Sequence, residues 1–403
     1  MAVRHPIRPA YDLQTNALRK SSSRWAIMPK KGPVAIRSKQ PGTAMAVTTG
    51  MIGRGFYNRN SAPQWAAINY VLPWIVEAAS GMDFADPPAT VGLADFGCSE
   101  GGNSIAVMTT LVAACREHTT RPIQTIHSDL PTNDFSELFK RLRPEGRSVF
   151  GEAVQSAAVG GSMYDQLLPP RSVHFATTFN AIGFLGARPL DRLPGYILPN
   201  GPSRLRGVGA VAEAEHAAFE QQAARDLEAF LTARSAELVP GGKLLVEVFG
   251  AGAEHRTCDG IYDVLNDALL AHVSDGTISR NVYETFYQPV YFRTLDELTA
   301  PVTAPQAQCA GLFRLERVES YEVPIPFVED YQGSGDVDVY ANAFTNFLRA
   351  FTEPVLRLHL GHDPDPSTVV TSIYDHIKGL LRANPERYPF HYVAHAMLLT
   401  RIG

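Results

Sequence analysis

Along the chain, short apolar runs alternate with longer stretches in which hydrophobic residues recur at helical spacing. Apolar runs predict buried strands at Val91 to Ala94, Ile123 to Asp129, Ser172 to Thr177 and Lys243 to Phe249. Helical spacing predicts helices over Ala62 to Ala79, Ser104 to Cys115, Phe135 to Leu142 and Ala212 to Leu238. Strands that alternate with helices indicate an α/β fold with a mostly parallel, doubly wound sheet.

The last third of the chain departs from this alternation. Residues 258–311 and 333–389 have mainly helical spacing broken by Pro and Gly, whereas 312–323 and 391–401 have the pattern of strands. Two late strands separated by a long insertion predict a hairpin added to the sheet, with a helical cap inserted around it. Earlier in the chain, the Gly and Pro pairs within Gly151 to Pro170 predict a loop.

Two of the predicted strands end in an acidic residue. Asp95 closes the first strand and leads into the glycine-rich turn Gly97-Cys98-Ser99-Glu100-Gly101-Gly102-Asn103, and Asp129 closes the second. In a doubly wound sheet both should face one crevice beyond the strand ends. The turn fails the nicotinamide fingerprint at Ser99, and an acid before the glycines suits a cationic ligand such as S-adenosylmethionine (SAM). A strand-to-helix turn without a ligand stays open, and Asp129 would suit the ribose of either cofactor.

Three polar side chains near the predicted elements could carry chemistry. Tyr57 lies in a glycine-flanked loop and Gln64 on the first turn of a helix for which Ser61 is the expected N-cap. Packing does not explain Tyr57 and Gln64, so ligand contact and a surface position both stay open. His174 lies inside a predicted strand, which favours a hydrogen-bonded core histidine over a base.

Composition narrows the partners. The 403 residues are 45% hydrophobic and carry a net charge of −5, which argues against a nucleic-acid partner and for a small molecule or a protein. The four cysteines form no C-x-x-C pair, so we expect a reducing compartment, the cytoplasm, and neither zinc nor disulfides. No apolar run reaches the roughly 18 to 20 residues of a membrane span.

Residues 1–45 differ from the rest of the chain. They hold nine Lys or Arg against one acid, Asp12, without clear periodicity. This composition predicts a basic, disordered N-terminal arm. Organelle targeting and a start codon set too far upstream are the alternatives.

Three ordered motifs resemble those of one known family. They are Tyr57-x-x-Asn60-Ser61-x-x-Gln64, Asp95-x-Gly97-Cys98-Ser99-x-Gly101-x-Asn103 and Asp129-Leu130-Pro131-x-Asn133-Asp134-Phe135. In these residues, and over about 53–401, the chain resembles the SABATH methyltransferases, which methylate small carboxylic acids or, in the caffeine branch, ring nitrogens with SAM as donor.

The resemblance implies a fold, a cofactor and a set of site residues. The fold would be a Rossmann-like class I SAM methyltransferase over 46–403, with a mostly parallel seven-stranded sheet and cap insertions at roughly 190–215, 253–310 and 333–385. SAM would be bound by Ser61, Asp95, Gly97, Asn103, Asp129, Leu130, Ser162 and Met163. Tyr57 and Gln64 would clamp the acceptor carboxylate, and the family mildly favours a homodimer.

The chain departs from the family pattern at three places that bear on substrate and metal. The family tryptophan that helps to hold the carboxylate is Phe184 here, which has no donor. Gln64 would then hold the acid with less help, or Asn180, Arg188 or a cap residue would compensate. Gly183 replaces a bulky residue and is expected to widen the substrate pocket. The stretch that holds Mg²⁺ in some members reads Glu284-Thr285-Phe286-Tyr287, which disfavours a metal and leaves Glu284 as its only candidate ligand.

These observations predict a SAM-dependent carboxyl O-methyltransferase that converts a small organic acid to its methyl ester. Proton-transfer residues are not expected, because a carboxylate is already a nucleophile at neutral pH. Arg188, Arg293 and Arg314 could pair with a second carboxylate, although a surface position is expected for each. The alternatives are N- or phenolic O-methylation, a nicotinamide-dependent oxidoreductase, and a SAM-binding protein without turnover.

Overall fold

The computed structural model describes residues 48, 50–84, 88–206, 209–361 and 366–403. The predicted arm at 1–45 lies outside these residues. Seven strands form one sheet: β1 (Val91–Phe96), β2 (Ile123–Asp129), β3 (Val154–Gly160), β4 (Val173–Phe179), β5 (Leu238–Phe249), β6 (Phe313–Val323) and β7 (Tyr392–Arg401). Their order is β3-β2-β1-β4-β5-β7-β6.

In the described sheet, β1 to β6 all run in one direction, and β7 runs antiparallel to them. β7 lies between β5 and β6 and pairs antiparallel with both, from Lys243 opposite Thr400 to Phe249 opposite Ala394 on the β5 side. The chain therefore reverses its direction in the sheet only after the cap has been inserted between β6 and β7. The predicted hairpin at 312–323 and 391–401 is confirmed.

β3 corrects the loop that was predicted for Gly151 to Pro170. Its residues pair in parallel register with β2, from Val154 opposite Ile123 to Gly160 opposite Asp129. β3 is an edge strand and only Val154 is buried. A half-exposed edge strand needs few apolar side chains, so its sequence lacks the buried-strand signal.

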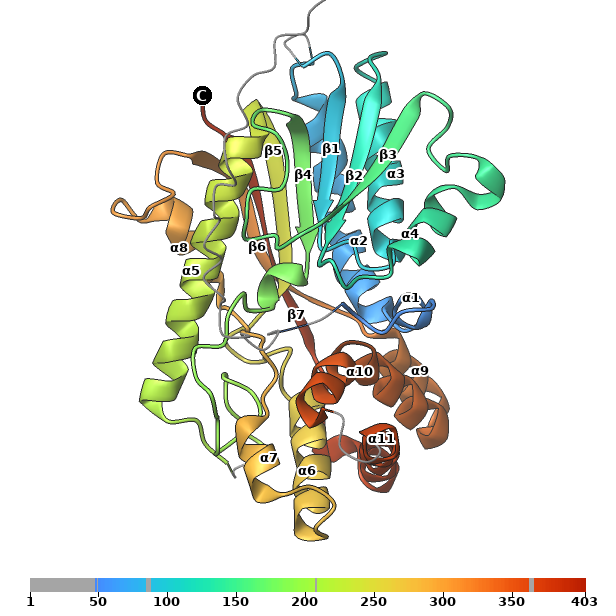
Figure 1. Ribbon diagram of the computed structural model, residues 1–403, viewed down its shortest axis with the longest axis vertical. Coiled ribbons are helices and arrows are strands. Elements are labelled where there is room, and N and C mark those ends of the chain that lie inside the picture. Colours follow the sequence, from blue (N-terminus) through green and yellow to red (C-terminus); the bar gives the residue numbers. More distant parts are fainter. Residues whose placement is uncertain (1–47, 49, 85–87, 207–208, 362–365) are drawn as a thin grey trace, which may run out of the picture. The chain divides into compact units, whose positions relative to one another are not determined.

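Helices cover both faces of the sheet. The helices are α1 (Phe56–Arg59), α2 (Ala62–Ser80), α3 (Gly102–Arg116), α4 (Phe135–Leu142), α5 (Glu213–Glu237), α6 (Ile261–Ser274), α7 (Arg280–Thr285), α8 (Leu295–Thr303), α9 (Pro326–Ser334), α10 (Val337–Leu360) and α11 (Pro366–Ala383), with short 3₁₀ turns η1 (Pro144–Gly146), η2 (Ala181–Gly183) and η3 (Pro385–Arg387). α2 and α3 cover one face, and α5 and α8 cover the other (Figure 1).

Alternating side chains of β5 supply both faces with core residues. Leu245 belongs to the apolar cluster on the α2 side, whereas Val246 and Val248 belong to the cluster packed on α5. Side chains on successive residues of a strand point to opposite faces, so a strand buried on both faces reads as a continuous apolar run. Glu247 interrupts this run on the α2 side.

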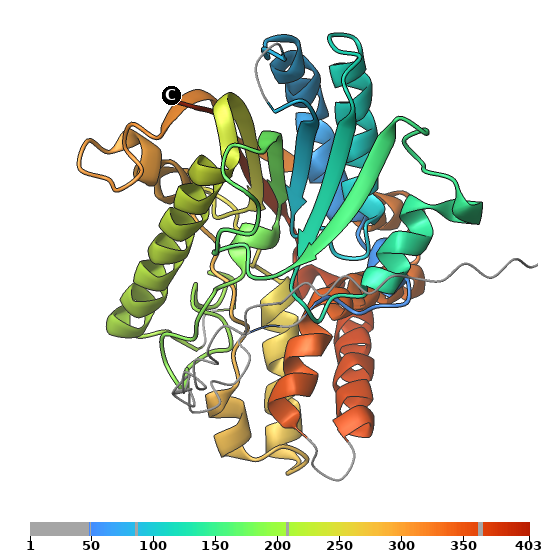
Figure 2. The ribbon, with the colours of Figure 1, turned by 45° about the horizontal axis from the view of Figure 1, so that its top comes forward.

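The cap lies beyond the carboxyl ends of the parallel strands. It consists of α6, α7, α9, α10 and α11, and both views show α6, α10 and α11 side by side there (Figures 1 and 2). The α2-side core cluster continues from the sheet into these helices through residues such as Leu265, Leu348 and Ile373. α8, although its sequence lies within the predicted insertion 253–310, packs against α5 and β6 instead.

Candidate active site

A cavity of about 260 Å³ opens at the carboxyl ends of β1, β2 and β4. It is lined by Thr48, Gly50, Met51, Tyr57, Gly97, Ser99, Asp129, Leu130, Gly161, Ser162, Met163, Tyr164, Phe179, Asn180, Ala181, Phe184, Leu185 and Gly186. Five of the eight residues predicted to bind the cofactor line it: Gly97, Asp129, Leu130, Ser162 and Met163. Ligands of doubly wound sheets bind in the crevice beyond the carboxyl ends of the parallel strands.

The glycine-rich turn brings backbone N–H groups to this cavity. Gly97 has φ +94°, and a Cβ there would lie 2.2 Å from Cβ of Ala181, so only glycine allows the close approach. Ser99 also has positive φ, and its backbone N–H donates to Oδ2 of Asp129 at 2.7 Å. The serine that breaks the nicotinamide pattern is thus tied to the acid that ends β2.

Asp95 and Asn103 line a smaller cavity of about 20 Å³ together with Tyr57 and Asn180, residues that also border the larger one. Asp95 is 3% exposed and accepts a hydrogen bond from Oγ1 of Thr177 at 2.7 Å. Burial raises the pKa of Asp95 to about 6 and that of Asp129 to about 6. One buried and one partly buried carboxyl, with no lysine or arginine among the residues lining these cavities, form an environment that a cation stabilises.

The larger cavity (the cofactor cavity) has hydrogen-bond donors and acceptors that fit SAM. Asp129 holds its carboxylate rigid by accepting the N–H groups of Ser99 and Leu130, each at 2.7 Å, which leaves one further lone pair on each oxygen for ribose hydroxyls. Oγ of Ser99 is buried at the cavity and has no partner among the described residues. The acids match the positive charge of the sulfonium and amino groups.

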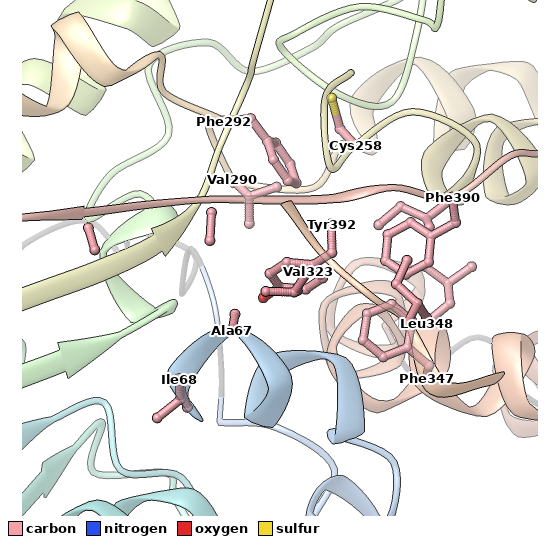
Figure 3. Close-up of a cluster of buried hydrophobic side chains, with 14 of the residues drawn as sticks. Ala67, Ile68, Cys258, Val290, Phe292, Val323, Phe347, Leu348, Phe390 and Tyr392 are labelled. Atoms are coloured by element: carbon pink, nitrogen blue, oxygen red, sulfur yellow. The ribbon is translucent and has the colours of Figure 1, made fainter. Parts of the chain in front are cut away.

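A second, narrower cavity of about 40 Å³ (the acceptor cavity) adjoins the first and shares Met51, Tyr57, Asn180 and Phe184 with it. Its other lining residues are Gln64, Phe249, Thr257, Ile261, Tyr262, Phe292, Phe347, Phe351 and Tyr392, from the sheet and the cap. Figure 3 shows Phe347, Leu348 and Phe390 grouped beside Tyr392, with Ala67 of α2 beneath. The walls are almost entirely aromatic or aliphatic, which suits an apolar ligand body.

Tyr57 and Gln64 supply free polar groups to this apolar cavity. Neither side chain makes a hydrogen bond to any described residue, and Oε1 of Gln64 is buried without a partner. Burial, followed by the nearby carboxyl of Asp129, raises the pKa of Tyr57 well above its usual range, so the phenol stays protonated. Polar side chains without partners are rare in apolar cavities of folded proteins and indicate a ligand site.

Asn180 can offer at most one N–H in place of the missing tryptophan donor. Its Oδ1 accepts from the hydroxyl of Tyr392 at 2.8 Å and from the N–H of Phe249 at 3.1 Å. Its Nδ2 donates to Glu247 at 3.2 Å. These bonds fix the amide, and one N–H of Nδ2 is left over. Phe184 borders both main cavities and offers only its ring edge and face.

The expected widening at Gly183 is wrong. Gly183 is buried in η2, and a Cβ there would lie 2.1 Å from Cζ of Phe249. The ring of Phe249 therefore fills the space that the small residue leaves. Phe249 itself lines the acceptor cavity, so Gly183 shapes that cavity only through this ring.

The arginines proposed for a second carboxylate face elsewhere. Arg293 is buried, contrary to the expected surface position, and donates to the carbonyl oxygens of Ile182 and Ala223 at 2.6 Å each. Arg314 pairs with Glu316 on β6, and the guanidinium of Arg188 lies 3.9 Å from the ring centre of Tyr287. None of the three lines either main cavity.

Glu284 is engaged by cations rather than placed for a metal. It pairs with Arg192 and with Arg280, and these contacts lower its pKa. Within the described ranges, His255, Glu322 and His391 form the one cluster of metal-capable side chains. Its imidazole rings stack 3.6 Å apart and 3° from parallel. Parallel rings at that spacing cannot both direct a lone pair at one ion, and His391 pairs with Glu322 instead.

Two further predicted residues lie away from the cavity walls. Ser61 is the N-cap residue of α2, as predicted, but its buried Oγ donates to the carbonyl of Asn58 at 3.4 Å and makes no capping hydrogen bond. His174 is a core histidine, as predicted: its Nδ1 accepts from the N–H of Gly92 at 3.2 Å, and burial lowers its pKa to about 4.

Most residues of the apolar wall of the acceptor cavity are not predicted by the sequence patterns. Phe249 ends β5, a position that the strand-end rule could have flagged. Phe347 and Phe351 lie four residues apart on α10, a spacing that reads as ordinary core. No signal in the sequence separates pocket-lining aromatic residues of the cap from packed ones.

Comparisons with known proteins agree with this geometry. A family model described as SAM dependent carboxyl methyltransferase matches residues 44–402. The chain is 25% identical to a probable jasmonic acid carboxyl methyltransferase 1 of Theobroma cacao, over 81% of this chain and 91% of that protein. It is 29% identical to a 3,7-dimethylxanthine N-methyltransferase of Camellia sinensis var. assamica, over 79% and 86%.

A solved structure shares the fold. It is described as loganic acid methyltransferase with SAH, has 23% sequence identity, and superposes with a TM-score of 0.70 over 88% of this chain and 99% of that one. The Rossmann-like methyltransferase fold with a mostly parallel seven-stranded sheet is therefore confirmed. No helix in the described part of the chain has the length and apolar character of a bilayer span.

Proposed function

The chain belongs to the SAM-dependent carboxyl methyltransferases, and from this premise we propose that Tyr57 and Gln64 hold the carboxylate of a small monocarboxylic acid beside the methyl donor. One observation carries the proposal. In a cavity with apolar walls, these two side chains present polar groups that no described residue satisfies. A carboxylate only accepts hydrogen bonds, so it would take them from the two donors, the hydroxyl of Tyr57 and Nε2 of Gln64.

The bound cofactor supplies a methyl group activated by a sulfonium. A carboxylate oxygen forms the new C–O bond at the methyl carbon while the C–S bond breaks and sulfur keeps the electron pair, which yields a methyl ester and a neutral thioether. The protein contributes orientation and exclusion of water. Holding reacting atoms in line is worth roughly 7 to 11 kcal/mol of the barrier, so the clamp is the main catalytic device.

The residues near the cavity favour an acid over a phenol or a ring nitrogen. A phenol or a ring N–H usually loses a proton on methylation and needs a base. Tyr57 is kept neutral by burial, and His174 is bonded to Gly92 inside the core. A carboxylate needs no base, because it is already ionised at neutral pH.

The walls of the acceptor cavity favour a single charge and an apolar body. Phe249, Phe292 and Phe351 contribute aromatic surface, and neither lysine nor arginine lines the cavity as far as the structure describes the chain. A second carboxylate placed among these rings would be desolvated without a partner, at a cost of several kcal/mol. Dicarboxylic acids should therefore be poor substrates.

The test is methyl transfer from labelled SAM to benzoate, hexanoate and adipate. We expect methyl esters of the two monocarboxylic acids and little ester of adipate. Gln64→Ala should lower kcat/KM roughly 10- to 100-fold, since a hydrogen bond to a charged group is worth about 1.5 to 3 kcal/mol. Gln221→Ala, which alters an exposed amide on α5, is the control and should match the wild type.

Calorimetry with SAM separates the clamp from the cofactor site. Gln64→Ala should bind SAM as the wild type does, and Asp129→Ala should lose that binding. Unchanged transfer to every acid by Gln64→Ala would show that the clamp is placed wrongly.

A further inference from the structure

Behind the acceptor cavity lies a carboxyl group that methyl transfer does not use. Glu247 on β5 is fully buried between Phe179 of β4 and Ala396 of β7. Its Oε1 has no hydrogen-bond partner among the described residues. Burial raises its pKa well above the usual range, and no cation in the described part of the chain offsets the effect. A buried and unpaired carboxylate would cost several kcal/mol, so this group is held as the neutral acid.

Glu247 contacts Asn180 twice. Its Oε2 accepts from Nδ2 of Asn180 at 3.2 Å, and its carbonyl oxygen accepts from the backbone N–H of Asn180 at 2.8 Å. Asn180 has φ +62°, a left-handed conformation that a residue with a side chain rarely adopts. The bonds to Glu247, Phe249 and Tyr392 together hold it there.

Asn180 lies where the cavities meet. It lines the cofactor cavity, the acceptor cavity and the small cavity next to Asp95. A shift of this residue would change both the position of the acceptor and its distance from the methyl donor. Because misplacement by about 1 Å can cost 10²-fold in rate, a residue that fixes Asn180 acts on the reaction itself.

The groups around the Glu247 carboxyl are uncharged. Tyr57 of α1, Tyr321 of β6 and Tyr392 of β7 lie near Glu247, and burial raises the pKa of each well above its usual range, so all three remain protonated. α2 presents the amide of Gln64 to the same region. A negative charge at Glu247 would also repel the acceptor carboxylate, which the neutral acid does not.

We propose that Glu247 is a positioning residue that works as a neutral carboxylic acid and holds Asn180 at the junction of the cofactor and acceptor cavities. The inference rests on the proposed function, since the group being positioned is the acceptor's neighbour in methyl transfer. It concerns a residue that touches neither substrate nor cofactor and that the clamp assignment does not include.

Three variants test the proposal with the best acid substrate. Glu247→Gln is uncharged and keeps an oxygen for Asn180, so it should retain kcat to within about tenfold. Glu247→Leu removes the acceptor and should lower kcat on the order of 100-fold, with SAM affinity by calorimetry unchanged. Asn180→Gly keeps the left-handed backbone without the side chain and should reproduce the Glu247→Leu loss.

Infrared spectroscopy reads the proton directly and without turnover. The difference spectrum between the wild type and Glu247→Gln should contain the carbonyl band of a protonated carboxyl at neutral pH. The same difference for Glu237→Gln, a buried glutamate paired with Arg234 at 2.8 Å, should lack that band.

Several outcomes would overturn the proposal. Absence of the band for Glu247 would mean that the group is ionised. Equal loss of kcat in Glu247→Gln and Glu247→Leu would mean that the anion is required. Additive losses in the double variant Glu247→Leu/Asn180→Gly would mean that the two residues act separately. Failure of the proposed function looks different, because the wild type would then transfer no methyl group to any acid.

Discussion

Gly183 and Phe249 share one space at the wall of the acceptor cavity. The ring of Phe249 approaches the backbone of Gly183 so closely that even a methyl group cannot fit between them. Phe184, the next residue, packs edge-to-face against the same ring at 6.3 Å between centroids. The ring of Phe249 therefore forms this wall, and it can lie there because Gly183 has no side chain.

Gly183→Ala should disturb this wall. Overpacking of a tight core costs typically 1 to 3 kcal/mol, and the ring of Phe249 would be pushed into the acceptor cavity. We expect a lower free energy of unfolding in urea and a raised KM for the acid. Gly379→Ala on α11, where a Cβ meets open space, is the matched control and should be neutral or stabilising by up to about 1 kcal/mol.

The double variant Gly183→Ala/Phe249→Leu should recover part of the lost affinity, because the smaller side chain makes room for the new methyl group. A KM for Gly183→Ala equal to that of the wild type would show that the ring moves without cost.

At this scale the sequence predicted the polar residues that line the cavities better than the apolar ones. Asp95, Asp129, Tyr57 and Gln64 stand out because an acid at a strand end or a lone donor has no packing role. Phe249 does not stand out, since an apolar side chain at the end of a buried strand is ordinary core. Glu247 lies inside the apolar run Leu244 to Phe249, where an acid has no packing role, so the sequence does carry a signal at this position.

Helix α10 contributes both to the cap core and to the acceptor cavity. Phe347 is 3% exposed and packs with Phe327 and Phe390 at 5.8 and 5.2 Å between ring centroids. Phe351, one turn later, is only partly buried and lines the same cavity. One face of the helix thus holds the cap together while its continuation shapes the substrate site.

Alanine at these two positions should separate the two roles. Phe347→Ala should lower the free energy of unfolding by about 3 to 5 kcal/mol, as for other buried phenylalanines. Phe351→Ala should cost less stability and enlarge the cavity, so that longer monocarboxylic acids gain relative to shorter ones in kcat/KM. Urea unfolding and a chain-length series of linear acids measure the two effects.

If both variants changed stability and chain-length preference in the same proportion, α10 would act as a unit and the division of roles would be wrong.

Elements with strong patterns were predicted closely, and elements with weak ones were not. α4 over Phe135–Leu142 matches its prediction, and Asp134 caps it by accepting the N–H of Glu137. β3 was missed because an edge strand with half-exposed side chains lacks apolar periodicity. α8 could not be separated from the cap by sequence, because helical spacing does not tell which surface a helix covers.

Across the whole molecule, buried acids and buried histidines act on stability in opposite directions. Asp95 and Asp129 have pKa values raised to about 6, so they stabilise the fold fully below their unfolded pKa of about 3.9 and lose that contribution as pH rises through 6. His127 and His174 have pKa values lowered to about 4, so their contribution is lost as pH falls from about 6.5 to 4. Between pH 4 and 6 the two pairs largely cancel.

Asp129→Asn should unbalance this compensation. Removing one acid whose proton is held more tightly in the folded state should make the free energy of unfolding rise more steeply with pH. The slope should change by up to about 1.4 kcal/mol per pH unit between about pH 4 and 6. Urea unfolding at several pH values measures it, with the exposed Asp330→Asn as control. Identical slopes for the variant and the wild type would contradict the raised pKa of Asp129.

The sequence by itself determined the fold class, the parallel strands β1, β2, β4 and β5, and the meeting of Asp95 and Asp129 at one edge of the sheet. The physical reason is that these depend on local rules: apolar periodicity defines strands and helices, and acids at the carboxyl ends of parallel strands must meet at one edge of the sheet. Asp95, Asp129 and the glycine turn are assembled by that rule alone.

Only the tertiary structure decided the shape of the acceptor side. Its walls come from β4, β5, β7 and the cap, which are far apart in sequence, and apolar side chains carry no mark of whether they face a core or a cavity. The same holds for Glu247, whose neutrality and contact with Asn180 follow from complete burial between β4 and β7. Burial and partner distances are properties of packing, so they exist only once the chain has folded.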